Sequence, residues 1–181
     1  MKTKMETQQI EIALTSLVKK YKDQDDSGVE NIPNNLLCKM AALELCGWIE
    51  DTHDEIILNC LEKIKSNLNN SDTNFKKLEN DIKKQLNNTH GLSYTNHLRK
   101  LLVLTLGEYL TLKLEKDIAT IESLQSELDT FHHYRNDLAH QSVTNPRLQQ
   151  LLAPNIVFQK FQTISIALKE IEDYLSARTP I

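Results

Sequence analysis

Residues 98–114 read Leu98-Arg-Lys-Leu-Leu-Val-Leu-Thr-Leu-Gly-Glu-Tyr-Leu-Thr-Leu-Lys-Leu114, with an apolar side chain at more than half of the positions. On a helix these side chains would occupy nearly every side, whereas an amphipathic surface helix keeps its apolar residues on one stripe. We therefore expect a single buried helix here, at the centre of the fold.

Helical periodicity continues on both sides of this stretch. Apolar residues recur at intervals of three and four in further segments, which predict helices over residues 7–21, 35–66, 75–88, 118–138 and 156–175. The chain has 4 Gly and 4 Pro, too little turn-forming sequence for a sheet of many strands. With 181 residues it is long enough for one core but short for two. The prediction is an all-α fold, a single-domain bundle of about five to six helices over residues 1–181.

Two features interrupt the helical pattern. The polar run from Asp23 to Gly28 predicts a loop after the first helix. Gly47 lies inside the long second helix, where glycine lowers helix propensity, and we expect it to mark close helix packing or a bend.

Charge and cysteine content exclude several classes of protein. The net charge is -4 and the pI about 5.9, whereas a general nucleic-acid coat protein carries a strong basic excess. No segment approaches the length of a bilayer-spanning helix, and the polar start is unlike a secretion signal, so we expect a cytoplasmic protein that does not bind membranes. Cys38, Cys46 and Cys60 form no C-x-x-C pair, and we expect reduced core residues rather than a disulfide or zinc site.

The segment from Phe131 to His140 is the part of the chain best suited to chemistry. On a helix that turns about 100° per residue, Arg135, Asn136 and His140 fall within about 140° of one another, and the apolar side chains of the segment lie largely on the other side. An arginine can grip phosphate and an imidazole can move a proton near neutral pH, as phosphodiester cleavage requires. We predict that Arg135, Asn136 and His140 form a catalytic site, with the asparagine supplying most of the specificity of the pattern.

Alternative roles remain for the same helix. Arg135 could instead pair with Asp129 or Glu127 on an ordinary surface helix. His132 and His133 diverge on a helix because they are adjacent, so a metal site is not expected. The simpler interpretation is that both histidines are solvated or lie in the core. The alternative is that they contact the substrate.

RNA contacts outside the motif would have to be local because the chain is acidic overall. One basic cluster consists of Lys76, Lys77, Lys83 and Lys84. Glu79 and Asp81 are interleaved with it, which is typical of a solvated helix face. Another cluster consists of His97, Arg99 and Lys100. Arg99 and Lys100 are therefore the additional substrate-binding residues that we predict.

In the hexapeptide Arg135-Asn-Asp-Leu-Ala-His140 the chain resembles the HEPN domain, the higher-eukaryote and prokaryote nucleotide-binding helical superfamily. The hallmark of that superfamily is an arginine and a histidine separated by a short spacer, commonly with a polar residue directly after the arginine. The setting is also similar, because the motif lies late in a compact helical chain and one long helix follows it. Residues 42–50 are more weakly similar to an early helix of some bacterial members.

The resemblance implies a metal-independent endoribonuclease of the bacterial toxin or phage-defence type, working without a cofactor. It also implies a homodimer in which the two motifs face each other, with an antitoxin or another regulatory protein as a possible partner. Attack of a ribose 2′-OH on its phosphate needs a base and an acid, and one histidine cannot be both in the same step. A twofold interface supplies two copies of His140. Arg135 would then stabilise the phosphorane, and Asn136 would orient the phosphate or an imidazole.

The 2′-OH requirement makes RNA the expected substrate, most readily a single-stranded loop. Toxins paired with nucleotidyltransferase antitoxins carry a tyrosine two residues after the histidine, where this chain has Ser142. That difference argues against control by modification of a tyrosine. Two other classes of function remain open: a non-catalytic helical module that binds nucleotide, RNA or a partner protein, and a structural subunit whose polar stripe lies at an oligomer interface.

Overall fold

A computed structural model describes residues 2–27, 33–67, 73–88, 91–140 and 151–178, and the regular elements in these ranges are all helices. They are α1 (Lys2–Ser27), α2 (Asn34–Asn67), α3 (Thr73–Asn88), the π-helical turn η1 (Tyr94–Leu98), α4 (Arg99–Leu106), α5 (Glu108–Asp117), α6 (Ile121–His140) and α7 (Pro154–Arg178). The all-α prediction is therefore confirmed. The α-helices are more numerous than expected because residues 98–114 form two of them.

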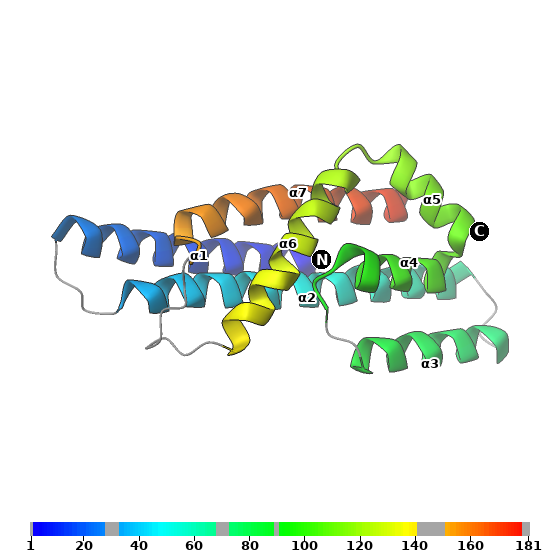
Figure 1. The fold of residues 1–181 in the computed structure, drawn as a ribbon. Helices are drawn as coiled ribbons and strands as arrows, with labels where there is room; N and C mark the ends of the chain where they lie inside the picture. The colour runs from blue at the N-terminus through cyan, green and yellow to red at the C-terminus, as the bar shows by residue number, and fades with distance from the viewer. Residues whose placement is uncertain (1, 28–32, 68–72, 89–90, 141–150, 179–181) are drawn as a thin grey trace.

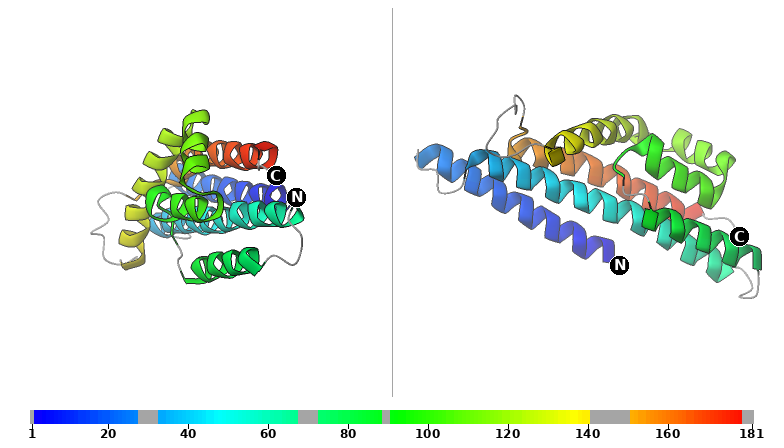
Figure 2. Two further views of the ribbon diagram at one scale, coloured as in Figure 1. Left: turned by 90° about the vertical axis from the view of Figure 1, so that its right-hand side faces the viewer. Right: turned by 60° about the horizontal axis from the view of Figure 1, so that its bottom comes forward.

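Three long helices, α1, α2 and α7, lie side by side and form the body of the molecule (Figure 1). Helix α6 crosses this body and packs on both α2 and α7. Helices α3 and α4 pack against α2 and against each other, and α5 folds back on α4. Figure 2 shows that α6 lies across the outside of the three-helix body and that α3 lies at its periphery. The helix that carries the motif is therefore a surface helix fixed by two of the three long ones.

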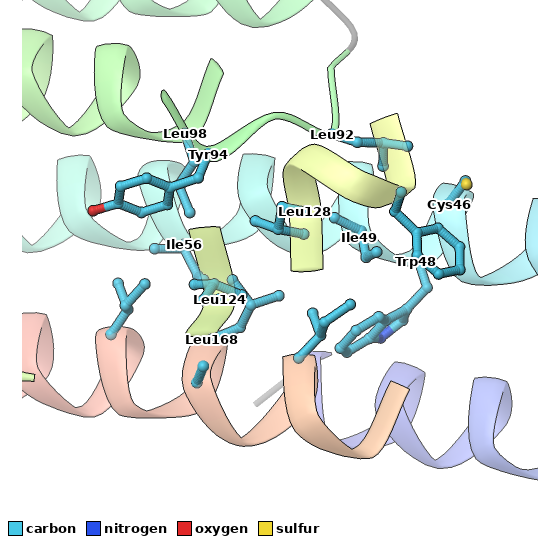
Figure 3. Close-up of a cluster of buried hydrophobic side chains, with 14 of the residues drawn as sticks. Cys46, Trp48, Ile49, Ile56, Leu92, Tyr94, Leu98, Leu124, Leu128 and Leu168 are labelled. Atoms are coloured by element: carbon cyan, nitrogen blue, oxygen red, sulfur yellow. The ribbon is translucent and has the colours of Figure 1, made fainter. Parts of the chain in front are cut away.

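A cluster of buried apolar side chains lies where α6 packs on the body (Figure 3). Ile49 of α2 and Leu128 of α6 are completely buried there, and Leu124 and Leu168 are 1% exposed. The indole of Trp48 packs edge-on against Phe161 of α7, with ring centroids 5.1 Å apart. Burial of each such side chain stabilises the fold by about 1.5–3 kcal/mol. This packing sets the rotation of α6 about its own axis.

The prediction of one central helix over residues 98–114 is wrong. Gly107 adopts φ 84°, a left-handed conformation that ends α4 and starts α5. Several apolar side chains of the stretch are consequently exposed: Leu104 by 41%, Leu112 by 52% and Tyr109 by 75%. The most deeply embedded long helix is instead α2, which packs against α1, α3, α4, α6 and α7.

The loop expected after the first helix is also wrong, as is one of the two reasons expected for Gly47. Asp23 to Ser27 continue α1 instead of forming a loop, and the amide of Gln24 donates a hydrogen bond to Asn34 at 3.0 Å. Gly47 lies in a continuous α2, and a Cβ added to it would meet no atom within 4 Å. Close helix packing is therefore not the reason for a glycine at that position.

Cys38, Cys46 and Cys60 are buried free thiols, as predicted. All three project from α2 into the core. In the part of the chain that the structure describes, none of the helices combines the length and the apolar character needed to cross a bilayer.

Candidate functional site

The predicted catalytic residues lie on the last turns of α6, and the apolar face of that helix positions them. Leu124, Leu128, Phe131 and Leu138 are all at most 2% exposed, and they repeat along one side of the helix. With that side held against α2 and α7, the side chains of Arg135 and Asn136 are half-buried at the edge of the contact. The backbone of His140 completes α6, and its side chain lies outside the described part of the structure, as does the whole of Ser142.

Arg135 pairs with Glu50 of α2. Its Nη2 lies 3.7 Å from Glu50 Oε1, and the two side chains are 38% and 21% exposed. The same carboxylate oxygen is buried and accepts no hydrogen bond from the described residues, so the guanidinium is its compensating charge. The 3.7 Å separation exceeds hydrogen-bond length, which leaves the N–H donors of Arg135 available to another oxygen.

The two carboxylates proposed from sequence as partners of Arg135 are engaged elsewhere. Asp129 accepts a 2.7 Å hydrogen bond from the hydroxyl of Ser93, and Glu127 forms an ion pair with Lys160 of α7. The alternative of an ion pair within α6 does not hold, because helical spacing shows neighbours on one helix but not residues of a crossing helix. Glu50 is the last residue of the stretch 42–50, which is weakly similar to an early HEPN helix. The sequence of that stretch does not indicate that Arg135 is its partner.

A buried thiol and a phenol complete the inner side of the site. Burial raises the pKa of Cys46 to about 12, with a further rise from Glu50 and an opposing effect of Arg135. Cys46 is thus a protonated packing group near neutral pH and a poor nucleophile. The hydroxyl of Tyr134 accepts a 2.8 Å hydrogen bond from the backbone N–H of Leu152, which ties the end of α6 to the start of α7.

Asn136 contacts a histidine on its own helix. Its Nδ2 lies 3.4 Å from Nε2 of His132, one turn earlier, so the amide can orient that imidazole. The rings of His132 and His133 are 5.7 Å apart, and His133 is exposed. The described site therefore contains Arg135, Asn136 and His132 from α6 together with Glu50 from α2. His133 lies beside it on the solvent side.

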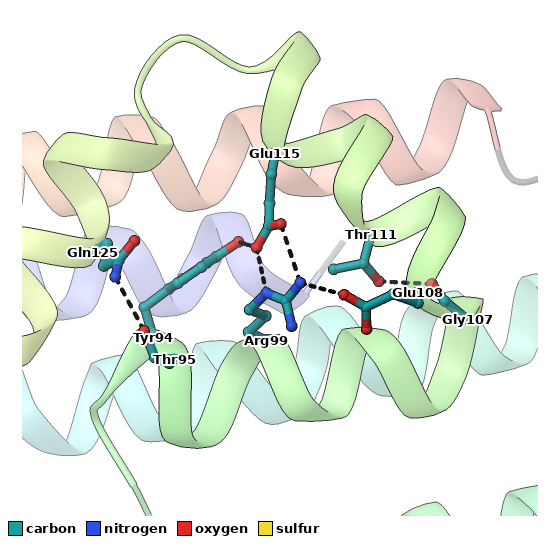
Figure 4. A network of polar contacts seen from close by, with 8 residues as sticks. All are labelled: Tyr94, Thr95, Arg99, Gly107, Glu108, Thr111, Glu115 and Gln125. Carbon is teal, nitrogen blue, oxygen red and sulfur yellow. Dashed lines mark hydrogen bonds and ion pairs between the residues drawn. The ribbon is translucent and has the colours of Figure 1, made fainter.

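Arg99 and Lys100 do not join this group. Arg99 donates to Glu115 at 2.8 Å and to Glu108 at 2.6 Å, and Glu115 also accepts a 3.0 Å hydrogen bond from the hydroxyl of Tyr94 (Figure 4). These contacts clamp α5 onto α4 and η1, and they raise the pKa of Arg99 through its hydrogen bonds to Glu108 and Glu115. Lys100 is exposed. The structure thus gives Arg99 a structural role that its position in a basic cluster did not indicate.

A buried histidine pair is the polar feature that the sequence did not indicate. His53 of α2 is fully buried, and neither ring nitrogen is in hydrogen-bond geometry with a described residue. Its ring lies 5.9 Å from that of His97, which is 6% exposed. Burial lowers the pKa of His53 to about 3, with a further lowering by His97 that the backbone of Gly91 partly opposes. No periodicity distinguishes such a histidine from an apolar core residue.

Within the described ranges, no three or more His, Cys, Asp or Glu side chains form a group that could hold a metal ion. The described site itself offers a guanidinium from Arg135, an amide from Asn136 and an imidazole from His132. Comparisons of the chain with protein-family models, with curated proteins and with solved structures returned no significant match.

Proposed function

We propose that the chain is a metal-independent endoribonuclease that cuts single-stranded or loop RNA by attack of the 2′-OH on the adjacent phosphate, as a toxin or phage-defence effector. The observation that carries the proposal is that Arg135 forms an ion pair with a carboxylate while its hydrogen-bond donors stay available. Its guanidinium lies 3.7 Å from Glu50, while the side chain is 38% exposed and its N–H donors are available for a phosphate. A purely structural arginine would instead donate hydrogen bonds from its guanidinium to protein oxygens, as Arg99 does.

Each residue has a distinct role in this chemistry. His140 takes the proton from the 2′-OH in one copy of the chain and delivers a proton to the leaving 5′-oxygen in the other copy. Arg135 stabilises the charge that develops on the phosphorane, and Glu50 keeps the guanidinium in place. Asn136 orients the phosphate or an imidazole, consistent with its 3.4 Å contact with His132.

A surface beside the site supports the dimer that this division of labour requires. Met40 and Leu43 of α2 are 41% and 42% exposed. Together with Gly47, also exposed, and Glu50 they fall within about 80° on the helix. The two exposed apolar side chains offer a second copy of the chain an apolar surface to bury. Such an interface would bring two α6 motifs together.

The test is cleavage of RNA by the purified protein in the presence of a chelator. We expect the wild type to cut, and Arg135→Ala and His140→Ala to lose activity by at least about a hundredfold, the lower range for loss of one acid–base group or one charged stabiliser. Lys76→Ala, a change of one exposed lysine on α3, is the matched control and should leave cleavage unchanged. Full activity in both site variants would refute the proposal.

A second candidate, a non-catalytic module that binds RNA, nucleotide or a partner protein, is favoured by the ion pair itself. Glu50 competes with any phosphate for Arg135 and lowers the net positive charge of the site. This candidate predicts that RNA is bound but not cut, and that Arg135→Ala weakens binding. It is excluded if the wild type shows chelator-resistant cleavage that His140→Ala abolishes.

A further inference from the structure

The outer side of α5 presents an unusual set of exposed side chains. It consists of Tyr109, Leu112, Lys113 and Lys116, here called the α5 face. On a regular helix these four positions fall within an arc of about 100°. Tyr109 is 75% exposed and Leu112 is 52% exposed, although both types of side chain usually gain from burial.

The acidic side chains of α5 are engaged by residues of neighbouring elements. Glu108 and Glu115 both point at Arg99, and Asp117 accepts a 3.0 Å hydrogen bond from the hydroxyl of Tyr174 on α7. Lys113 and Lys116 form no ion pair with any residue that the structure describes. Although α5 carries more acids than bases, its open side is therefore cationic and aromatic.

The way α5 is attached leaves this side available. The main packing of α5 is against α4, and the Arg99 network and the turn at Gly107 fix it there (Figure 4). A membrane-surface helix needs a broad apolar face that sinks into the lipid, whereas α5 has 10 residues and exposes one tyrosine and one leucine. A polyanion with flat apolar groups matches the α5 face better.

We infer that the α5 face binds single-stranded RNA, with a base stacked on Tyr109 and backbone phosphates on Lys113 and Lys116. Stacking on an exposed aromatic ring beside lysines is the usual way of holding single strands without reading their sequence. The positions from Tyr109 to Lys116 span about 10 Å along the helix axis, and Leu112 lies among them as an apolar support. The choice of RNA over DNA rests on the proposed function, since neither stacking nor phosphate contacts read the 2′-OH.

Binding of a short 2′-O-methyl oligouridylate, followed by fluorescence anisotropy, tests this inference. The blocked 2′-oxygen cannot attack phosphate, so binding is measured whether or not the protein is a nuclease. We expect Tyr109→Ala to weaken binding by at least about fivefold and Tyr109→Phe to retain it, because stacking needs the ring and not the hydroxyl. Lys113→Gln with Lys116→Gln should reduce the steepness of the salt dependence by about 1.4, as expected for two single-strand phosphate contacts.

The double change Lys76→Gln with Lys77→Gln removes the same charge from exposed positions of α3 and is the matched control. An affinity and salt dependence equal to the wild type in the α5 variants would overturn the inference. So would variants that lose binding to phosphatidylglycerol vesicles while their RNA affinity is unchanged. A protein that binds through the α5 face but never cuts RNA contradicts the proposed nuclease alone, whereas normal RNA affinity in the variants of a working nuclease contradicts this inference alone.

Discussion

Arg135 and Glu50 belong to helices far apart in the sequence, and their pairing is the feature of the site that depends most on tertiary structure. The residue types of the motif and their common helix face follow from the sequence between Phe131 and His140. The partner of the arginine does not, because a crossing helix contributes it at a distance of 3.7 Å. Residue spacing along one helix contains no information about such a contact.

A double-mutant cycle measures what this pair contributes to stability. Arg135→Ala leaves a buried carboxylate oxygen without its cation, and Glu50→Gln removes the charge that needs compensation. Since both side chains are partly exposed, we expect a coupling free energy of about 0.5–1 kcal/mol from urea unfolding of the single and double variants. Strictly additive effects would show that the two groups do not interact.

His53 makes the stability of the fold depend on pH. Its pKa is about 3 in the folded chain, against an ordinary value of 6.5, so below about pH 6.5 the unfolded chain binds a proton that the folded chain rejects. Stability should therefore fall as the pH drops from 6.5 towards 3, by at most about 1.4 kcal/mol per pH unit from this group.

Chemical unfolding of wild type and His53→Leu between pH 7 and pH 4 checks this expectation. The variant keeps a buried side chain but has no imidazole to protonate, so its stability should fall less steeply. His97, the other member of the pair, remains in both proteins, so the variant removes one imidazole. Parallel pH profiles for the two proteins would contradict the assignment.

At the scale of elements, helical periodicity predicted the long amphipathic helices well. The residues typical of turns predicted the ends of the helices less well. The expected helices over residues 35–66 and 75–88 agree closely with α2 (Asn34–Asn67) and α3 (Thr73–Asn88). Residues 98–114 were predicted as one helix because their leucines continue on both sides of Gly107. The positive φ of Gly107 separates the two helices, and α5 packs on α4. A stretch with apolar residues on every side of one helix can instead form two shorter helices, each with its own apolar face.

The two glycines give opposite predictions for the same substitution. Gly107→Ala places a Cβ on a backbone with φ 84° and ψ 160°, a region that essentially only glycine adopts, and should destabilise the fold by about 1–3 kcal/mol. Gly47→Ala adds a methyl group to an open position inside a continuous helix and should stabilise it by about 0.5–1 kcal/mol. Thermal unfolding of the two variants distinguishes them, and a change of the same sign in both would contradict these backbone assignments.

At the scale of the whole molecule, the fold presents the motif helix at the surface instead of enclosing it. Helix α6 crosses the body formed by α1, α2 and α7, and its polar side remains at the edge of that contact (Figure 1). In the proposed reaction each copy of the chain supplies one arginine and one histidine, and a site at the surface can be shared between two copies. The exposed apolar residues Met40 and Leu43 lie on the same side of α2 as Glu50.

The most direct test of a shared active site is a mixing experiment. A fixed amount of wild type is allowed to exchange subunits with an equal amount of His140→Ala, and chelator-resistant RNA cleavage is then measured. If both histidines of a dimer are required, mixed dimers are inactive and the rate falls to about half of its starting value. A rate unaffected by the variant would show that one copy of His140 suffices and would contradict the account.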